Sequence, residues 1–147
     1  MAKQFKGRVL APGTYKGKAV VSHYGFNTLA TFQKSVLLNK KTVVAADQNN
    51  SDIFGKEITG IALCLPITIG STTGGMVLQV VCSMNLNPAC LLFSEPIDSL
   101  AAAGVVLSKV WENSSIIVVD NLGKEFLETV KTDDQLEVSE DGVVTIL

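Results

Sequence analysis

A chain of 147 residues with 12 basic and 14 acidic side chains has a formal net charge of −2, which argues against nucleic acid or an anionic membrane as its main ligand. Hydrophobic residues make up 47% of the chain and charged residues only 18%, so surplus apolar surface is expected to be buried against a partner. The length suits one compact domain over residues 1–147, and no apolar run approaches the roughly 20 residues that a membrane span requires.

The first half of the chain favours short strands separated by turns. Residues 5–10 and 18–22 alternate well enough for strands, and residues 42–46 favour another. Residues 25–28 favour a turn that leads into an irregular segment. The polar run 47–52, which contains Gln48 and Asn49, is a solvated loop by default. Its amide side chains offer a second interpretation, a loop that faces a substrate.

An alternation of apolar strands and helices follows, over residues 61–65, 75–84, 89–93, 97–110 and 116–119. This is the pattern of parallel βαβ units. The helix 97–110 is rich in alanine and nearly uncharged, so it should be buried on most sides. A short helix over 124–131 precedes a hairpin of residues 136–139 and 143–146, closed by a turn at 140–142. The sequence therefore predicts a parallel central sheet with a second, antiparallel layer.

The three cysteines, Cys64, Cys82 and Cys90, lie in or beside apolar runs and show no Cys-x-x-Cys spacing. Cysteines in such places most often serve as small buried hydrophobes, and free thiols fit a reducing compartment. The first residues lack the apolar stretch of a secretion signal. We therefore expect a cytoplasmic protein.

Between the strand 61–65 and the helix 75–84, three consecutive hydroxyl side chains are flanked by glycines: Gly70, Ser71, Thr72, Thr73, Gly74 and Gly75. Glycines let the backbone approach a ligand closely, and a helix N-terminus attracts an anion. The stretch lacks the Gly-Lys-Ser/Thr of a P-loop and the Gly-x-Gly-x-x-Gly of dinucleotide sites. A glycine-rich turn with one N-capping hydroxyl is the structural alternative, although three hydroxyls exceed what one cap needs.

Few other residues point to catalysis. His23 is the sole histidine and has no predicted carboxylate neighbour, so a surface or loop-packing role is favoured and a Ser-His-Asp triad with Ser71 is not expected. Ser71 could still act as a base if oriented amides or a partner's cation stabilised its alkoxide. Glu95 and Asp98 follow the strand 89–93, where a structural role beside a helix dipole is favoured. No cluster has the spacing of metal ligands.

The chain resembles the small subunit of two-chain aconitase X enzymes over nearly its whole length. The resemblance is carried by residues 5–8, 17–20, Gly70 with Ser71, 88–89, and Asp98 with 101–104. Residues 25–29, 47–50 and 94–98 are more similar to the bacterial branch, which dehydrates cis-3-hydroxy-L-proline, than to the archaeal branch, which dehydrates mevalonate 5-phosphate. Ile69 departs from the archaeal pattern, which has a basic residue ahead of Gly-Ser, and a phosphate would miss that charge.

The resemblance implies a three-layer β/β/α swivelling domain that closes over a large subunit. That subunit would hold an iron or iron–sulfur centre, and this chain would hold no cofactor. Ser71 would take the substrate α-proton while an iron-bound hydroxyl leaves as water, giving Δ1-pyrroline-2-carboxylate from hydroxyproline. The residues expected to bind the substrate are Thr72, Thr73, Gly74, Gly75, Asn27, Gln48 and Asn49.

Three hypotheses follow from the residues and the resemblance. The first is the catalytic small subunit of an iron-dependent dehydratase for cis-3-hydroxy-L-proline, inactive without its partner. The second is the small subunit of a mevalonate 5-phosphate dehydratase. The third is a non-catalytic module that uses the same anion cradle to bind a small carboxylate.

Overall fold

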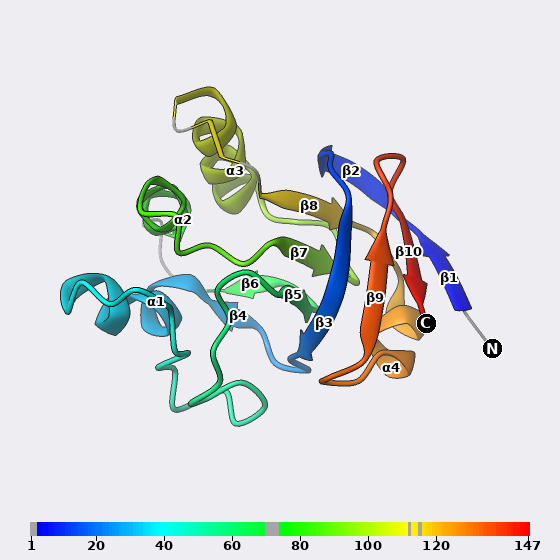
Figure 1. The fold of residues 1–147 in the computed structure, drawn as a ribbon, viewed down its shortest axis with the longest axis horizontal. Coiled ribbons are helices and arrows are strands. Elements are labelled where there is room, and N and C mark those ends of the chain that lie inside the picture. Colours follow the sequence, from blue (N-terminus) through cyan, green and yellow to red (C-terminus); the bar gives the residue numbers. More distant parts are fainter. Residues whose placement is uncertain (1–2, 70–73, 112, 115) are drawn as a thin grey trace.

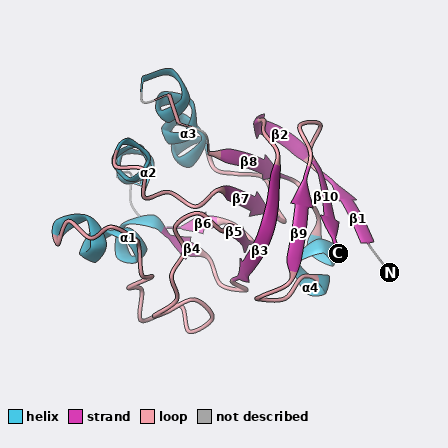
Figure 2. Ribbon diagram, in the orientation of Figure 1, coloured by secondary structure: helices cyan, strands magenta, loops and turns pink. Residues whose placement is uncertain are grey.

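The computed structural model describes residues 3–69, 74–111, 113–114 and 116–147. The strands in these ranges are β1 (Lys3–Lys6), β2 (Arg8–Ala11), β3 (Tyr15–Val21), β4 (Phe26–Asn27), β5 (Ala62–Leu65), β6 (Thr68–Ile69), β7 (Cys90–Phe93), β8 (Ile117–Asp120), β9 (Gln135–Val138) and β10 (Val143–Ile146). The helices are α1 (Thr28–Leu37), α2 (Gly74–Ser83), α3 (Ser99–Trp111) and α4 (Lys124–Thr129), and Figures 1 and 2 show their arrangement.

Eight of these strands form one mixed sheet in the order β1-β10-β9-β3-β5-β7-β8-β2. β3, β5, β7 and β8 run parallel, whereas β2 and the strands on the far side of β3 pair antiparallel. β1 and β2, at the two ends of this order, follow one another through Gly7, so the sheet closes nearly into a barrel (Figure 1). The prediction of parallel central strands is confirmed, but the antiparallel strands continue the same sheet.

β5, β7 and β8 are buried along their whole length. Successive side chains of a strand point to opposite sides, so both faces of these strands are covered. One set of side chains packs with the helices and includes Leu63, Leu65, Leu91, Phe93, Phe32, Leu78 and Val105. The other set packs with the antiparallel strands and α4, and includes Ala62, Cys64, Cys90, Leu92, Leu136, Val144 and Phe126. The predicted parallel strands 61–65, 89–93 and 116–119 are therefore confirmed, and their apolar runs are explained by burial on both faces.

The region between β3 and β5 differs most from the sequence prediction. Residues 28–37 form α1 instead of an irregular segment, with the Asn27 side chain accepting a hydrogen bond from the Ala30 N–H at 3.0 Å. The predicted strand 42–46 is wrong: within it only Val44 makes a bridge, to Glu57. The mixed apolar and polar residues of α1 pack because Phe32 reaches the core, where it meets Phe26 edge to face at 5.7 Å.

α3 is less enclosed than its composition predicts. Its solvent side carries Val106, Leu107, Val110 and Trp111, of which Trp111 is 75% exposed. The expectation of a helix buried on most sides is therefore wrong, because only the face that carries residues such as Ala101 and Val105 reaches the core. None of the described helices is both long and apolar enough to cross a lipid bilayer.

The turn that closes the β9–β10 hairpin depends on a glycine. Gly142 has a φ of +86°, and its carbonyl accepts a hydrogen bond from the Gly7 N–H at 3.1 Å, where β1 passes into β2. A Cβ at residue 142 would lie 2.7 Å from the Val9 side chain and 3.0 Å from the Gly7 carbonyl oxygen. Both the backbone conformation and the space around it therefore require glycine.

We predict that Gly142→Ala lowers the free energy of unfolding by about 2–3 kcal/mol, because strain at positive φ is added to this steric overlap. The matched control is Gly55→Ala, where φ is +79° but nothing lies within 4 Å of the added Cβ. Urea denaturation should show a loss of only about 1 kcal/mol for the control. Equal losses for the two variants would contradict the steric part of the explanation.

Candidate functional site

Three helices begin at the edge of the sheet where the parallel strands end. β4, β6 and β7 lead into α1, α2 and α3, and β4 pairs with β6 so that Asn27 lies opposite Ile69. The positive end of a helix dipole lies at each helix start, where the first N–H groups have no partner within the helix. One N–H of α1 is capped by Asn27 and one of α3 by the Asp98 carboxylate, and the first turns themselves contain no acidic residue. This edge of the sheet therefore favours an anionic ligand.

The predicted catalytic and carboxylate-binding hydroxyls, Ser71, Thr72 and Thr73, lie outside the described residues. Their neighbours are placed: β6 ends at Ile69, and α2 begins at Gly74 with Gly75 in its first turn. The Ile69 side chain is 51% exposed and lies against the Gly25 backbone, where a Cβ would be only 2.6 Å from Ile69 Cγ2. The roles of Ser71, Thr72 and Thr73 remain predictions.

The remaining predicted substrate contacts do not all lie at this edge. Asn27 does, and its side-chain oxygen already caps α1. Gln48 lines a groove beside the last turn of α1, at the other end of that helix. Asn49 lies on the exposed part of the same loop, where its N–H donates to Asp47 Oδ1 at 3.0 Å. Of these three residues, the structure brings only Asn27 next to the strand that leads to Ser71.

Asp98 links β6 to the start of α3. One carboxylate oxygen accepts the Thr68 hydroxyl, and the other accepts the Ala101 N–H at 3.0 Å, which caps the helix. Thr68 lies two residues before Gly70, so this contact fixes the strand that enters the predicted site. The sequence favours a structural role for Asp98 beside the helix dipole. No sequence pattern signals its contact with Thr68, which is 30 residues away.

An ion pair between the partly exposed Arg8 and the buried Asp120 supports the segment before Asp98. Asp120, with no exposed surface, accepts hydrogen bonds from Arg8 Nε at 2.9 Å and Nη2 at 2.6 Å, and from the Ile97 N–H at 2.8 Å. The hydrogen bond and charge of Asp120 raise the pKa of the Arg8 guanidinium above its usual value. Sequence reasoning missed this pair, because a single aspartate after an apolar run signals only the end of a strand.

His23 has a carboxylate partner, which corrects the expectation that it has none. Its backbone N–H donates to Asp52 Oδ2 at 2.7 Å, and its Nδ1 lies 3.1 Å from the same oxygen. The backbone on either side of His23 is held by buried groups. Asn50 Nδ2 donates to Ser22 Oγ at 2.8 Å, and the Ser22 hydroxyl donates to the Tyr24 carbonyl. The imidazole is therefore fixed at the end of β3, although nothing described places it against a reacting group.

The described residues do not fit an iron centre. They contain no group of three or more His, Cys, Asp or Glu side chains that could hold a metal ion. Cys64, Cys82 and Cys90 are buried thiols. Burial raises the pKa of Cys90 to about 12 and that of Cys64 further, so neither would supply the thiolate that binds a metal.

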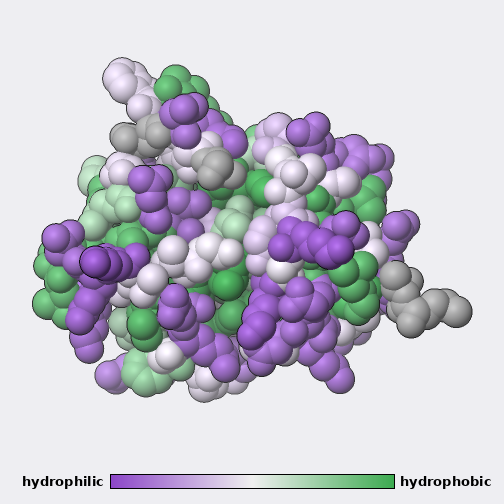
Figure 3. Space-filling model, in the orientation of Figure 1, coloured by the Kyte–Doolittle hydropathy of each residue, from purple (hydrophilic) through white to green (hydrophobic). Residues whose placement is uncertain are grey.

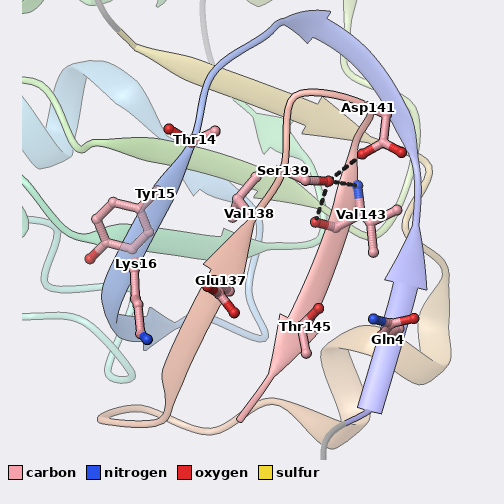
Figure 4. Close-up of a pocket in the computed structure, with 10 residues that line it drawn as sticks. All are labelled: Gln4, Thr14, Tyr15, Lys16, Glu137, Val138, Ser139, Asp141, Val143 and Thr145. Carbon is pink, nitrogen blue, oxygen red and sulfur yellow. Dashed lines mark hydrogen bonds between the residues drawn. The ribbon is translucent and has the colours of Figure 1, made fainter.

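A second cavity, of about 640 Å³, lies on the outer face of the antiparallel strands, away from the helix starts (Figure 4). Its lining residues are Gln4, Thr14, Tyr15, Lys16, Glu137, Val138, Ser139, Asp141, Val143 and Thr145. The Ser139 hydroxyl donates to Asp141 and holds the pKa of that carboxyl below its usual value. Ser139 Oγ also accepts the Val143 N–H at 3.2 Å, so these groups stabilise the hairpin turn.

The comparison with protein families decides the classification. A family model described as the aconitase X swivel domain matches residues 4–146. The chain belongs to this family. A solved relative agrees: the crystal structure of Thermococcus kodakaraensis aconitase X in its holo-form superposes with a TM-score of 0.81 and 26% identity, over 99% of this chain and 98% of the other.

Two curated relatives of this chain carry the name phosphomevalonate dehydratase small subunit. The protein from Methanocella arvoryzae is 29% identical over 144 residues, which cover 98% of this chain and 97% of that protein. The protein from Pyrococcus furiosus is 27% identical over 107 residues, 73% of this chain and 74% of that protein. These matches do not support the sequence-based preference for the hydroxyproline branch.

Proposed function

We propose that this chain is the small subunit of a two-subunit hydro-lyase, in which it binds a small carboxylate substrate and removes a proton from it. The observation that carries the proposal is the match to the aconitase X swivel family over residues 4–146, together with a relative named as a dehydratase small subunit that aligns from end to end. The convergence of three helix starts at one edge of the sheet supports an anionic substrate there.

The first substrate to consider is mevalonate 5-phosphate, because both relatives described above carry the phosphomevalonate name. A second candidate is cis-3-hydroxy-L-proline, and Ile69 favours it. This exposed apolar side chain lies directly before Gly70 and Ser71, so it offers no charge to a phosphate. Both compounds are carboxylates with a hydroxyl on the second carbon from the carboxylate, so one arrangement of residues would serve either.

In the proposed reaction, the Ser71 oxygen takes the proton from the carbon next to the carboxylate. The electrons of that C–H bond form a double bond to the neighbouring carbon, whose hydroxyl leaves and is released as water. Thr72, Thr73 and the N–H groups of Gly74 and Gly75 hold the carboxylate at the start of α2, where the helix dipole offsets its charge. Ser71 takes this proton as its alkoxide and then passes it to the departing hydroxide, which completes the water molecule and regenerates the alkoxide for the next turnover.

The described residues around this segment act as its support. Asp98 holds Thr68 at the entry of the segment, and Asp120 holds the backbone of Ile97 beside Asp98. These are positioning residues, because they act through the backbone that carries the reacting groups. An iron or iron–sulfur centre belongs to the large subunit in this proposal, since the described residues of this chain do not fit one.

The test is a dehydration assay of this chain reconstituted with its large subunit, supplied separately with mevalonate 5-phosphate and cis-3-hydroxy-L-proline. Mass spectrometry would follow the loss of one water molecule from each substrate. Turnover of one substrate alone assigns the branch. If neither compound loses water while the two subunits form a complex, the proposed reaction is wrong.

A further inference from the structure

A groove of about 450 Å³ runs beside the last turn of α1 and across the loop that follows it. Its lining includes three lysines, Lys34, Lys40 and Lys41, and three large apolar side chains, Leu38, Val44 and Phe54. At the left of Figure 3, over α1, strongly hydrophilic and hydrophobic surfaces lie side by side. The groove is at the opposite end of α1 from Asn27, and so it is separate from the candidate site.

The positive charge of the groove is not balanced within the described part of the chain. Neither Asp nor Glu is among its lining residues, and Lys34, Lys40 and Lys41 form no ion pair there. Three exposed lysines elsewhere are paired: Lys3 with Glu125, Lys18 with Asp133 and Lys124 with Glu128. Exposed lysines without an ion pair in the described part of the chain also occur outside the groove, for example Lys6, Lys16 and Lys131, so the groove is distinguished by having three of them together. The chain as a whole is negative, so this cluster of one sign stands out against it.

The fold itself does not require these lysines. α1 ends in a Schellman motif, with Asn39 at a φ of +51°, the Asn39 N–H bonded to the Val36 carbonyl and the Lys40 N–H bonded to the Ser35 carbonyl at 2.9 Å. The position of Lys40 in this motif commonly carries an apolar residue that packs on the helix. The helix dipole favours a cation at this end, and Lys34 in the last turn already supplies it.

The three large apolar side chains that line the groove are about half exposed and are not part of the core. Leu38 is 57% exposed and Phe54 is 49% exposed, although both belong to ordered turns: the Leu38 N–H bonds to the Lys34 carbonyl and the Phe54 N–H to the Asn50 carbonyl. A concave surface with apolar walls and a charged rim is typical of sites where a partner inserts an anchor side chain. A lipid surface would instead meet a convex or flat face.

We propose that this groove, defined by Lys34, Leu38, Lys40, Lys41, Val44 and Phe54, receives an acidic segment of the large subunit that carries a large apolar side chain. The acidic groups would pair with the lysines, and the apolar side chain would fill the space between Leu38 and Phe54. The inference rests on the proposed function in one respect, because the partner is the large subunit of that enzyme.

The test compares two triple variants in binding to the large subunit. Lys34→Glu, Lys40→Glu and Lys41→Glu together reverse the charge of the groove. Lys6→Glu, Lys16→Glu and Lys131→Glu change the net charge equally at exposed lysines that do not line the groove. We expect the groove variant to raise the Kd by about 10-fold or more at low salt, and the control by about 2-fold or less. The Kd of the wild-type chain should rise as the salt concentration increases, and the Kd of the groove variant should rise much less.

Phe54→Ala provides an independent measurement, since it removes the apolar wall and leaves the charges in place. It should raise the Kd by about 5-fold or more with little change in salt dependence. Equal Kd values for the groove and control triple variants would overturn the inference, as would the absence of any complex with the wild-type chain. If the groove variants weaken binding but neither substrate is dehydrated, the docking inference stands and the proposed reaction fails.

Discussion

Replacing Ser71 with alanine is expected to lower the rate of dehydration by the reconstituted enzyme by at least about 10²-fold, because the substrate proton would lose its acceptor. The effect should fall on kcat rather than on KM, since the carboxylate contacts proposed for Thr72, Thr73, Gly74 and Gly75 would remain. The rate should be measured with the large subunit in excess, so that weakened assembly cannot be mistaken for lost chemistry.

Ser83→Ala is the matched control for this variant. Ser83 lies at the other end of α2, is exposed, and donates its hydroxyl to the Val80 carbonyl at 2.6 Å. It should therefore leave both kcat and KM unchanged. A Ser71→Ala enzyme with a rate close to that of Ser83→Ala would reduce Ser71 to a helix cap and would favour the non-catalytic hypothesis.

Replacing Asp120 with alanine is expected to lower the free energy of unfolding by about 2–4 kcal/mol. The variant would leave the Ile97 N–H without its acceptor in a buried place and would remove the bidentate partner of Arg8. Arg8 itself is partly exposed and can be hydrated, so the loss should come mainly from the buried backbone group. Urea denaturation of the isolated chain measures this change directly.

The comparison for Asp120→Ala is Glu125→Ala, which breaks an ion pair with Lys3 whose side chains are both more than half exposed. That pair should contribute almost nothing, because water and salt screen it. The Asp120→Ala enzyme should also show a raised KM, since Ile97 is next to Asp98, which holds Thr68. A denaturation midpoint equal to that of Glu125→Ala would contradict the structural role assigned to the buried Asp120 carboxylate.

The parts of the fold that the sequence predicts well are those whose signals are local. The apolar runs of β5, β7 and β8 predict strands buried on both faces, and this prediction is confirmed. The turn at Gly142 is likewise confirmed, because glycine at a positive φ closes the hairpin. The sequence does not predict α1, whose observed support includes the Asn27 cap and the packing of Phe32 in the core.

The side-chain contacts between distant parts of the chain could not be predicted, because only the tertiary structure brings the two partners of each contact together. Asp52 meets His23 across 29 positions of the chain, Asp98 meets Thr68 across 30, and Arg8 meets Asp120 across 112. The run of hydroxyls at Ser71 is a local pattern, so the sequence alone directs attention to it. Its role in catalysis stays a prediction until it is measured.

The measurement that tests the proposed function most directly compares three samples: the large subunit alone, this chain alone, and the two mixed. Each would be assayed for loss of water from mevalonate 5-phosphate and from cis-3-hydroxy-L-proline. If this chain supplies the proton acceptor and the carboxylate site, only the mixture will turn over one of the substrates. Dehydration by the large subunit alone, at the same rate as the mixture, would show that the chemistry does not need this chain.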